Sequence, residues 1–134
     1  MPVNGIKRIR MKARTKGHSG ERELCRLLEN RLGIDRIERN VDQVRDGGAD
    51  ILSIPGFAIE VKRHEKLNIT VWWEQATRQA INKECTPILA YRQNRKPWNF
   101  AIPASFILPG SWDYIILREE TFIDWFKKQL TKSR

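Results

Sequence analysis

One short stretch of the chain, residues 48–62, constrains the fold more than any other. Its sequence, GADILSIPGFAIEVK, contains two apolar runs, residues 51–54 and 57–61, separated by Pro55-Gly56. Two such runs on either side of a proline-glycine pair are typical of a β-hairpin. The stretch therefore predicts two short antiparallel strands that any fold of this chain must accommodate.

The second of these strands places two charged side chains together. Alternation sends Glu60 and Lys62 to one face of the strand and its larger apolar residues to the other. A charged pair is costly to bury unless another group compensates it. An ordinary surface hairpin, with a Glu–Lys pair on its solvated face, is the alternative interpretation.

The length of the hairpin loop decides which residue lies opposite Glu60. A two-residue loop would set Asp50 opposite Val61, whereas a three-residue loop, residues 54–56, sets Asp50 directly across from Glu60. Cross-strand neighbours lie about 4.5–5.5 Å apart at Cβ. Two carboxylates that close repel each other, and a divalent cation between them relieves the repulsion. Oxygen ligands alone favour Mg²⁺ or Mn²⁺ over zinc.

Length and charge limit the kind of protein. With 134 residues, the chain is long enough for one domain with a real core. Its 25 basic and 16 acidic residues give a net charge of +9, which favours a polyanionic partner, with nucleic acid the first candidate. A basic protein that is merely soluble is the alternative. Two cysteines, Cys25 and Cys85, are too few for a disulfide framework and are expected to be reduced thiols. Without a secretory signal or an apolar run of about 20 residues, a cytoplasmic protein is expected.

The start of the chain is strongly basic. Residues 7–16, KRIRMKARTK, carry six cations and no acid. We expect residues 1–16 to form a basic arm and residues 17–134 to form a single domain. A solvated arm of this kind can bind phosphates, although a tail with no role would have the same composition. The candidate phosphate-binding residues of the arm are Lys7, Arg8, Arg10, Lys12, Arg14 and Lys16.

A helix is expected over residues 20–32, because Leu24, Leu28 and Leu32 recur at helical spacing. Glu21 falls on the same stripe. If it is simply a first-turn acid stabilised by the helix dipole, it should be exposed. If Glu21 instead has a functional role together with the hairpin acids, its side chain should point inward, toward the hairpin.

The rest of the chain alternates between strands and helices. Arg45 in the polar loop before Asp50 could lie beside a substrate, and the lone His64 is expected to contact solvent or phosphate. A stripe of Phe122, Trp125 and Phe126 on the last helix indicates core packing or half of a dimer interface. The expected elements are a short strand and polar loop over 34–47, a helix over 70–83, strands over 87–91, 99–102 and 114–117, and a helix over 119–130.

Together these residues resemble the PD-(D/E)xK nuclease superfamily, and within it the archaeal-type Holliday junction resolvases. The resemblance covers residues 16–76 and implies an α/β fold, a restriction-endonuclease-like core with a central mixed β-sheet flanked by helices. The strings that carry it, in order, are Lys16-Gly17-x-x-x-Glu21-Arg22-Glu23-Leu24, Gly48-Ala49-Asp50-Ile51, Ile59-Glu60-Val61-Lys62 and Glu74-Gln75-Ala76.

The resemblance also implies a catalytic site. Its three carboxylates would hold Mg²⁺, with Mn²⁺ able to substitute, aided by the backbone carbonyl near Val61. Its lysine would contact the attacking water or the scissile phosphate, and its glutamine would help to position that water or the lysine. The implied catalytic residues are Glu21, Asp50, Glu60, Lys62 and Gln75.

The activity implied is that of a Mg²⁺-dependent, structure-specific DNA endonuclease, with a four-way junction as substrate and a homodimer as the active assembly. Arg45, Arg63 and His64 would join the basic arm in binding DNA. Another nuclease of the superfamily, of a viral replication-repair or restriction-like type, is an alternative. A non-catalytic nucleic-acid-binding protein is the alternative from a different class.

Overall fold

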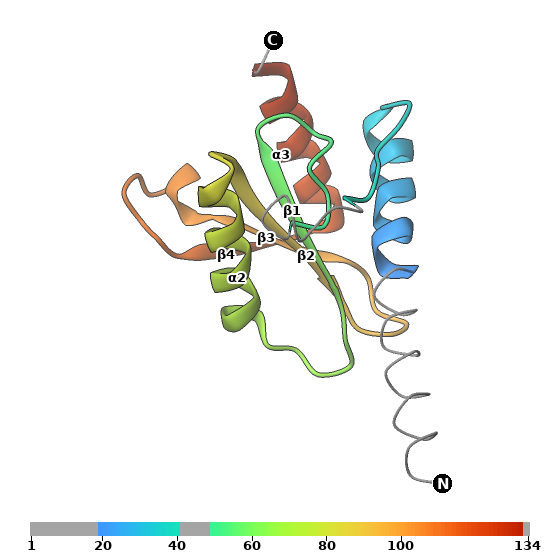
Figure 1. The fold of residues 1–134 in the computed structure, drawn as a ribbon, viewed down its shortest axis with the longest axis horizontal. Helices are drawn as coiled ribbons and strands as arrows, with labels where there is room; N and C mark the ends of the chain where they lie inside the picture. Colours follow the sequence, from blue (N-terminus) through green and yellow to red (C-terminus); the bar gives the residue numbers. More distant parts are fainter. Residues whose placement is uncertain (1–18, 41–48, 133–134) are drawn as a thin grey trace, which may run out of the picture.

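A four-stranded mixed sheet forms the centre of the molecule in the computed structural model, which describes residues 19–40 and 49–132 (Figure 1). The strand order is β1-β2-β3-β4; β1 and β2 are parallel, and the other neighbours are antiparallel. The strands are β1 (Phe57–Arg63), β2 (Thr86–Arg92), β3 (Asn99–Pro103) and β4 (Tyr114–Arg118).

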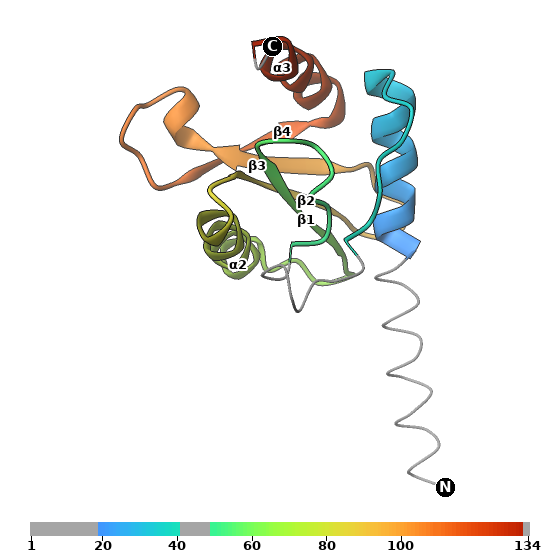
Figure 2. The same cartoon turned by 45° about the horizontal axis from the view of Figure 1, so that its top comes forward.

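Helices lie on both sides of this sheet (Figure 2). Because parallel strands cannot be joined by a tight turn, β1 is followed by the crossover helix α2 (Ile69–Asn82), which returns the chain to the start of β2. The helix α3 (Glu119–Lys132) lies on the opposite side. A helix over residues 19–32 stands beside the β1 edge, and a short 3₁₀ helix, η1 (Ala104–Phe106), follows β3.

The two faces of the sheet have different environments. The side chains of Ile59 and Val61 share one core with the helix over 19–32 and with α3. Alternation directs Glu60 and Lys62 to the other face, where their partners across the parallel pair are Leu89 and Tyr91. Those two partners pack against the tryptophans of α2. The carboxylate of Glu60 therefore lies on the face that α2 covers.

The aromatic stripe of α3 is part of the core. Phe122 and Phe126 are completely buried, and the Phe122 ring stacks on Phe100 with a centroid distance of 3.9 Å. Trp125 is half-buried and packs against the same core. The core-packing interpretation of the stripe is confirmed.

The predicted hairpin is confirmed in register but not in length. Of residues 51–54, only Ile51 forms a β-bridge, and its partner is Ile59. That pairing is the one expected from a three-residue loop, and by the same register it sets Asp50 across from Glu60. The first strand is therefore reduced to a single bridge.

Residues 34–40 form no strand, contrary to the prediction, and the remainder of the predicted segment, residues 41–47, lies outside the described residues. Residues 34–40 instead run beside the residues that precede β1. The Ser53 hydroxyl accepts a hydrogen bond from the Glu38 amide, and the Asn40 amide donates to the Asp50 carbonyl at 2.7 Å. These contacts hold the two irregular segments against each other.

The other expected elements are confirmed to within two residues at each described end, as is the α/β class with its mixed sheet flanked by helices. Both cysteines are free thiols. None of the described helices is long and apolar enough to cross a membrane. The predicted boundary between the arm and the domain lies outside the described residues.

Replacing Phe122 with alanine should lower the free energy of unfolding by about 3–5 kcal/mol, because it removes a fully buried ring from the core. The control is Trp112→Ala, since Trp112 is 84% exposed and its removal should change stability by less than about 0.5 kcal/mol. Urea unfolding of both variants checks the prediction, and equal losses would contradict it.

Candidate active site

Three charged side chains are buried in the part of the chain that the structure describes, and all three are carboxylates. Glu21 is 7% exposed, Asp50 6% and Glu60 4%, and no other polar or charged side chain among these residues is buried. Ionised carboxylates are rarely buried unless they are paired or bind a metal. The three acids singled out by the sequence are therefore also the three that the fold withdraws from solvent.

Backbone contacts fix Asp50 beside β1. The amides of Asp50 and Ile51 both donate to the Ile59 carbonyl, at 3.1 and 3.0 Å. The Val61 amide in turn donates to Asp50 Oδ2 at 2.7 Å. The chain before the hairpin loop is thus held against the strand that carries Glu60, with the Asp50 carboxylate turned toward it.

Glu21 reaches this region because its helix approaches β1 closely. A Cβ atom on Gly20 would lie 3.2 Å from the Cβ of Arg63, so only glycine leaves room for this approach without displacement. Glu21 points inward, and Arg39 Nε donates to its Oε2 at 2.8 Å. The prediction of an inward-facing Glu21 is confirmed, and that of an exposed first-turn acid is wrong.

Burial raises the pKa of both central acids above its ordinary value. The pKa of Asp50 is raised from 3.8 to about 8, first by burial and then by the negative charge of Glu60, while the Val61 amide opposes the shift. The pKa of Glu60 is also raised by burial, against the effect of Lys62. Lys62 Nζ lies 3.2 Å from Glu60 Oε1. The Glu60 Oε2 atom is buried without a hydrogen-bond partner among the described residues.

These features fit a divalent cation bound by Asp50 and Glu60. The pair offers only oxygen donors, the set that Mg²⁺ and Mn²⁺ prefer, and one of those oxygens is buried without a hydrogen bond. Glu21 is engaged by Arg39, and no group of three acid, histidine or cysteine side chains within residues 19–40 and 49–132 is arranged to hold a metal ion. Glu21 as a third ligand stays a prediction, as does the carbonyl near Val61.

The other predicted site residues occupy different surroundings. Gln75 is half-buried on α2, the helix that covers the Glu60 face, and its role stays a prediction. Arg63 is half-buried, with Nη1 3.9 Å from Glu23 Oε2. His64 is exposed, and its ring centroid lies 5.2 Å from that of Trp72. The predicted DNA-binding residues Lys7, Arg8, Arg10, Lys12, Arg14, Lys16 and Arg45 lie outside the described residues.

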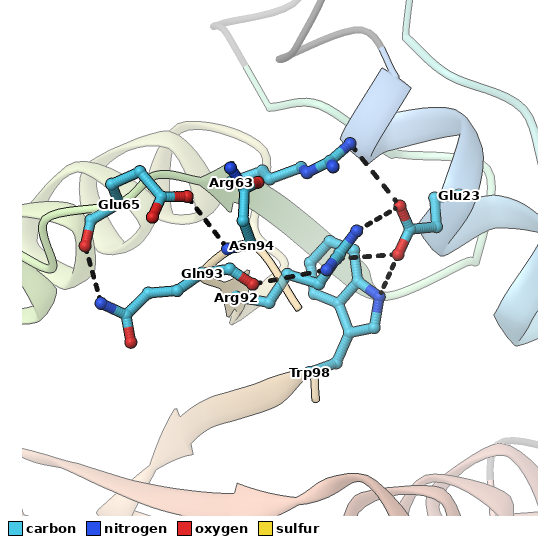
Figure 3. Close-up of polar contacts among 7 residues, drawn as sticks. All are labelled: Glu23, Arg63, Glu65, Arg92, Gln93, Asn94 and Trp98. Atoms are coloured by element: carbon cyan, nitrogen blue, oxygen red, sulfur yellow. Dashed lines mark hydrogen bonds and ion pairs between the residues drawn. The ribbon is translucent and has the colours of Figure 1, made fainter. Parts of the chain in front are cut away.

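A cluster around Glu23 was not anticipated from the sequence (Figure 3). Arg92 Nε and Nη2 lie 2.8 and 2.9 Å from its two carboxylate oxygens, and Trp98 Nε1 donates to Oε1 at 3.1 Å. These partners are 69 and 75 residues away in sequence, so no local spacing indicates them. The cluster ties the helix that carries Glu21 to the ends of β1 and β2.

The raised pKa of Asp50 predicts a pH dependence of stability in metal-free protein. Between about pH 4 and pH 8 the folded state retains a proton on Asp50 that the unfolded chain has lost, so unfolding releases a proton and stability falls as pH rises. The variant Asp50→Asn cannot titrate there. Thermal unfolding from pH 5 to pH 8 should show wild type losing stability relative to Asp50→Asn.

Magnesium is the control for that experiment. At pH 8, Mg²⁺ should raise the unfolding temperature of wild type and leave Asp50→Asn unchanged, because a ligand stabilises only the state that binds it. Parallel pH profiles of the two metal-free proteins would contradict the assignment of a buried, protonated Asp50.

A family model and a solved structure are similar to this chain. A family model described as "Phage putative PDDEXK endonuclease" matches residues 12–133. A search of curated proteins finds no match. Among solved structures, Hjc, a Holliday junction resolvase from the archaeal hyperthermophile Archaeoglobus fulgidus, is similar at 20% identity and a TM-score of 0.47, over 78% of this chain and 85% of that chain. Because the family model spans nearly the whole chain, including every residue of the buried carboxylate site, this protein belongs to the family of phage PDDEXK endonucleases.

Proposed function

We propose that this protein is a metal-dependent DNA endonuclease that cuts branched DNA, with the four-way junction as its substrate. The observation that carries the proposal is the buried pair of Asp50 and Glu60, with Lys62 3.2 Å from the second acid. Buried acids with raised pKa values and an adjacent cation are typical of a functional site rather than of a solvated hairpin.

Phosphodiester hydrolysis is slow because the anionic oxygens of the diester repel a nucleophile. Asp50 and Glu60 would hold a divalent cation, which when bound neutralises that charge and lowers the pKa of water. Lys62 is mostly buried on the same strand face as Glu60 and carries the positive charge to contact a scissile phosphate. The Val61 amide keeps the Asp50 carboxylate oriented throughout.

The choice of a four-way junction follows from the ordered strings that resemble the junction resolvases. A junction presents two symmetry-related scissile phosphates, so a C2 homodimer would supply one site for each. Hydrolysis would leave a 5′-phosphate and a 3′-hydroxyl. The net charge of +9 favours binding to such a dense polyanion.

A second candidate is a viral replication-repair nuclease that acts on linear or nicked DNA. The description of the matching family as a phage endonuclease favours it. Both candidates use the same carboxylate pair, so the substrate separates them and the mutations do not.

Cleavage of a labelled four-way junction in Mg²⁺, beside linear duplex and single strand, tests the proposal. Wild type should make paired nicks across the junction and ignore the linear duplex. Glu60→Gln should remove cleavage because it removes a cation ligand, and Lys62→Ala should lower the rate about 10²- to 10³-fold. Glu38→Gln is the control, since Glu38 is an exposed acid paired with Arg36 and should cut normally.

Each outcome separates the hypotheses. Cutting of linear DNA in preference to the junction would favour the second candidate. Binding of DNA without cleavage in Mg²⁺ or Mn²⁺, equal in wild type and Glu60→Gln, would contradict the enzyme proposal and leave a DNA-binding protein.

A further inference from the structure

Two exposed loops meet at the end of the sheet where β1 and β2 finish. Residues 64–68 follow β1, and residues 93–97 follow β2; because the two strands are parallel, both loops emerge at the same end. The His64 amide donates to the Arg92 carbonyl at 3.2 Å, which continues the pairing one step beyond the strands. Figure 1 shows this end of the sheet opposite the C-terminal end of α3.

Glu65 joins the two loops directly (Figure 3). Its backbone carbonyl accepts a hydrogen bond from Gln93 Nε2 at 2.6 Å, and its Oε1 accepts one from the Asn94 amide at 3.1 Å. The loops therefore form one surface, here called the two-loop surface, residues 64–68 and 93–97.

The cations near this end of the sheet fall into two groups. Arg63 and Arg92 are half-buried and directed at Glu23, which compensates one of their two charges within the protein. Lys66, Arg95 and Lys96 are exposed, and none forms an ion pair with an acid within residues 19–40 and 49–132. The second group is available to an external anion.

The backbone of Arg95 supports a role for its side chain. Its φ of 61° lies in the left-handed region, which a turn normally assigns to glycine or asparagine. An arginine at this position gives the loop tip an exposed cation where glycine would offer none.

A groove extends the two-loop surface toward α2. It has a volume of about 510 Å³ and is lined by Lys66, Leu67 and Asn68 together with the tilted rings of His64 and Trp72. A cation, an amide and two aromatic rings in one open groove can bind the phosphates and sugars of a nucleic acid strand.

We infer that the two-loop surface binds the phosphate backbone of a duplex arm of the DNA, next to the scissile position. Glu65 is the residue that positions the 93–97 loop within this surface. The inference rests on the proposed function. From Glu60 in β1 to His64, the first residue after the strand, the chain advances four residues, about 13 Å at an extended rise. At 3.4 Å per base pair, this distance is about four steps of duplex. An arm seated on the surface would thus extend to the Asp50–Glu60 site.

The first test compares two triple variants that remove the same charge. Lys66→Gln, Arg95→Gln and Lys96→Gln together alter the two-loop surface, while Lys127→Gln, Lys128→Gln and Lys132→Gln alter exposed residues of α3. Binding of each protein to a four-way junction and to duplex is measured without divalent metal, across salt concentrations. Unchanged unfolding temperatures establish that both variants are folded.

The surface variant should bind more weakly, and the slope of log K against log salt should become shallower by about 0.9 for each lost phosphate contact, or nearly 3 in all. The α3 variant should keep the wild-type slope. Equal losses in the two variants would show a diffuse charge effect and overturn the inference. Wild-type binding by the surface variant would also overturn it, as would the absence of DNA binding in wild type.

The second test uses Glu65, where charge and positioning predict opposite results. Glu65→Ala makes the protein more positive, so charge alone predicts tighter DNA binding. Loss of the acceptor for the Asn94 amide frees the 93–97 loop, so positioning predicts weaker binding. Glu65→Gln makes the same charge change but retains an acceptor and should bind at least as tightly as wild type. Tighter binding by both variants would overturn the positioning role.

These measurements are separate from the test of the proposed function, because binding is scored without metal. Cleavage by the wild type with no effect of the surface variant would leave the nuclease and remove the surface. Weakened binding by the surface variant, with no cleavage in wild type, would leave the DNA-binding surface and contradict the nuclease.

Discussion

Two carboxylates held side by side out of water are the constraint on which the rest of this structure depends. Burying an ionised acid without compensation is strongly unfavourable, and burying two adds their repulsion. Here the Val61 amide and Lys62 partly compensate Asp50 and Glu60, and the pKa values of both acids remain raised. A core that existed for stability alone would place apolar residues at both positions.

The fold maintains this arrangement by fastening several elements to the end of β1. Gly20 lets the first described helix approach Arg63, and Glu23 on that helix binds Arg92 and Trp98. These contacts hold in place the helix that carries Glu21. The site is therefore built from one strand, one irregular segment and one helix, each secured by contacts outside the site itself.

Sequence reasoning succeeded where the determining interactions are local. Alternation predicted the two faces of β1, and the loop length predicted the register that sets Asp50 across from Glu60. Helical spacing predicted that Glu21 points inward. Sequence reasoning failed where segments distant in sequence meet. Residues 38–40 bond to the Ser53 hydroxyl and to the Asp50 carbonyl, and no local spacing indicates these contacts.

The same distinction applies to charge. A net charge of +9 indicates a polyanionic partner but does not say which cations meet it. Arg63 directly follows Lys62 and was expected to bind DNA, yet it is half-buried beside Glu23, an acid 40 residues earlier in the chain. Lys66 and Lys96, which no motif marks, are exposed. A partner can reach only the cations that no acid of the folded protein pairs with. Long-range packing, rather than composition, decides which cations those are.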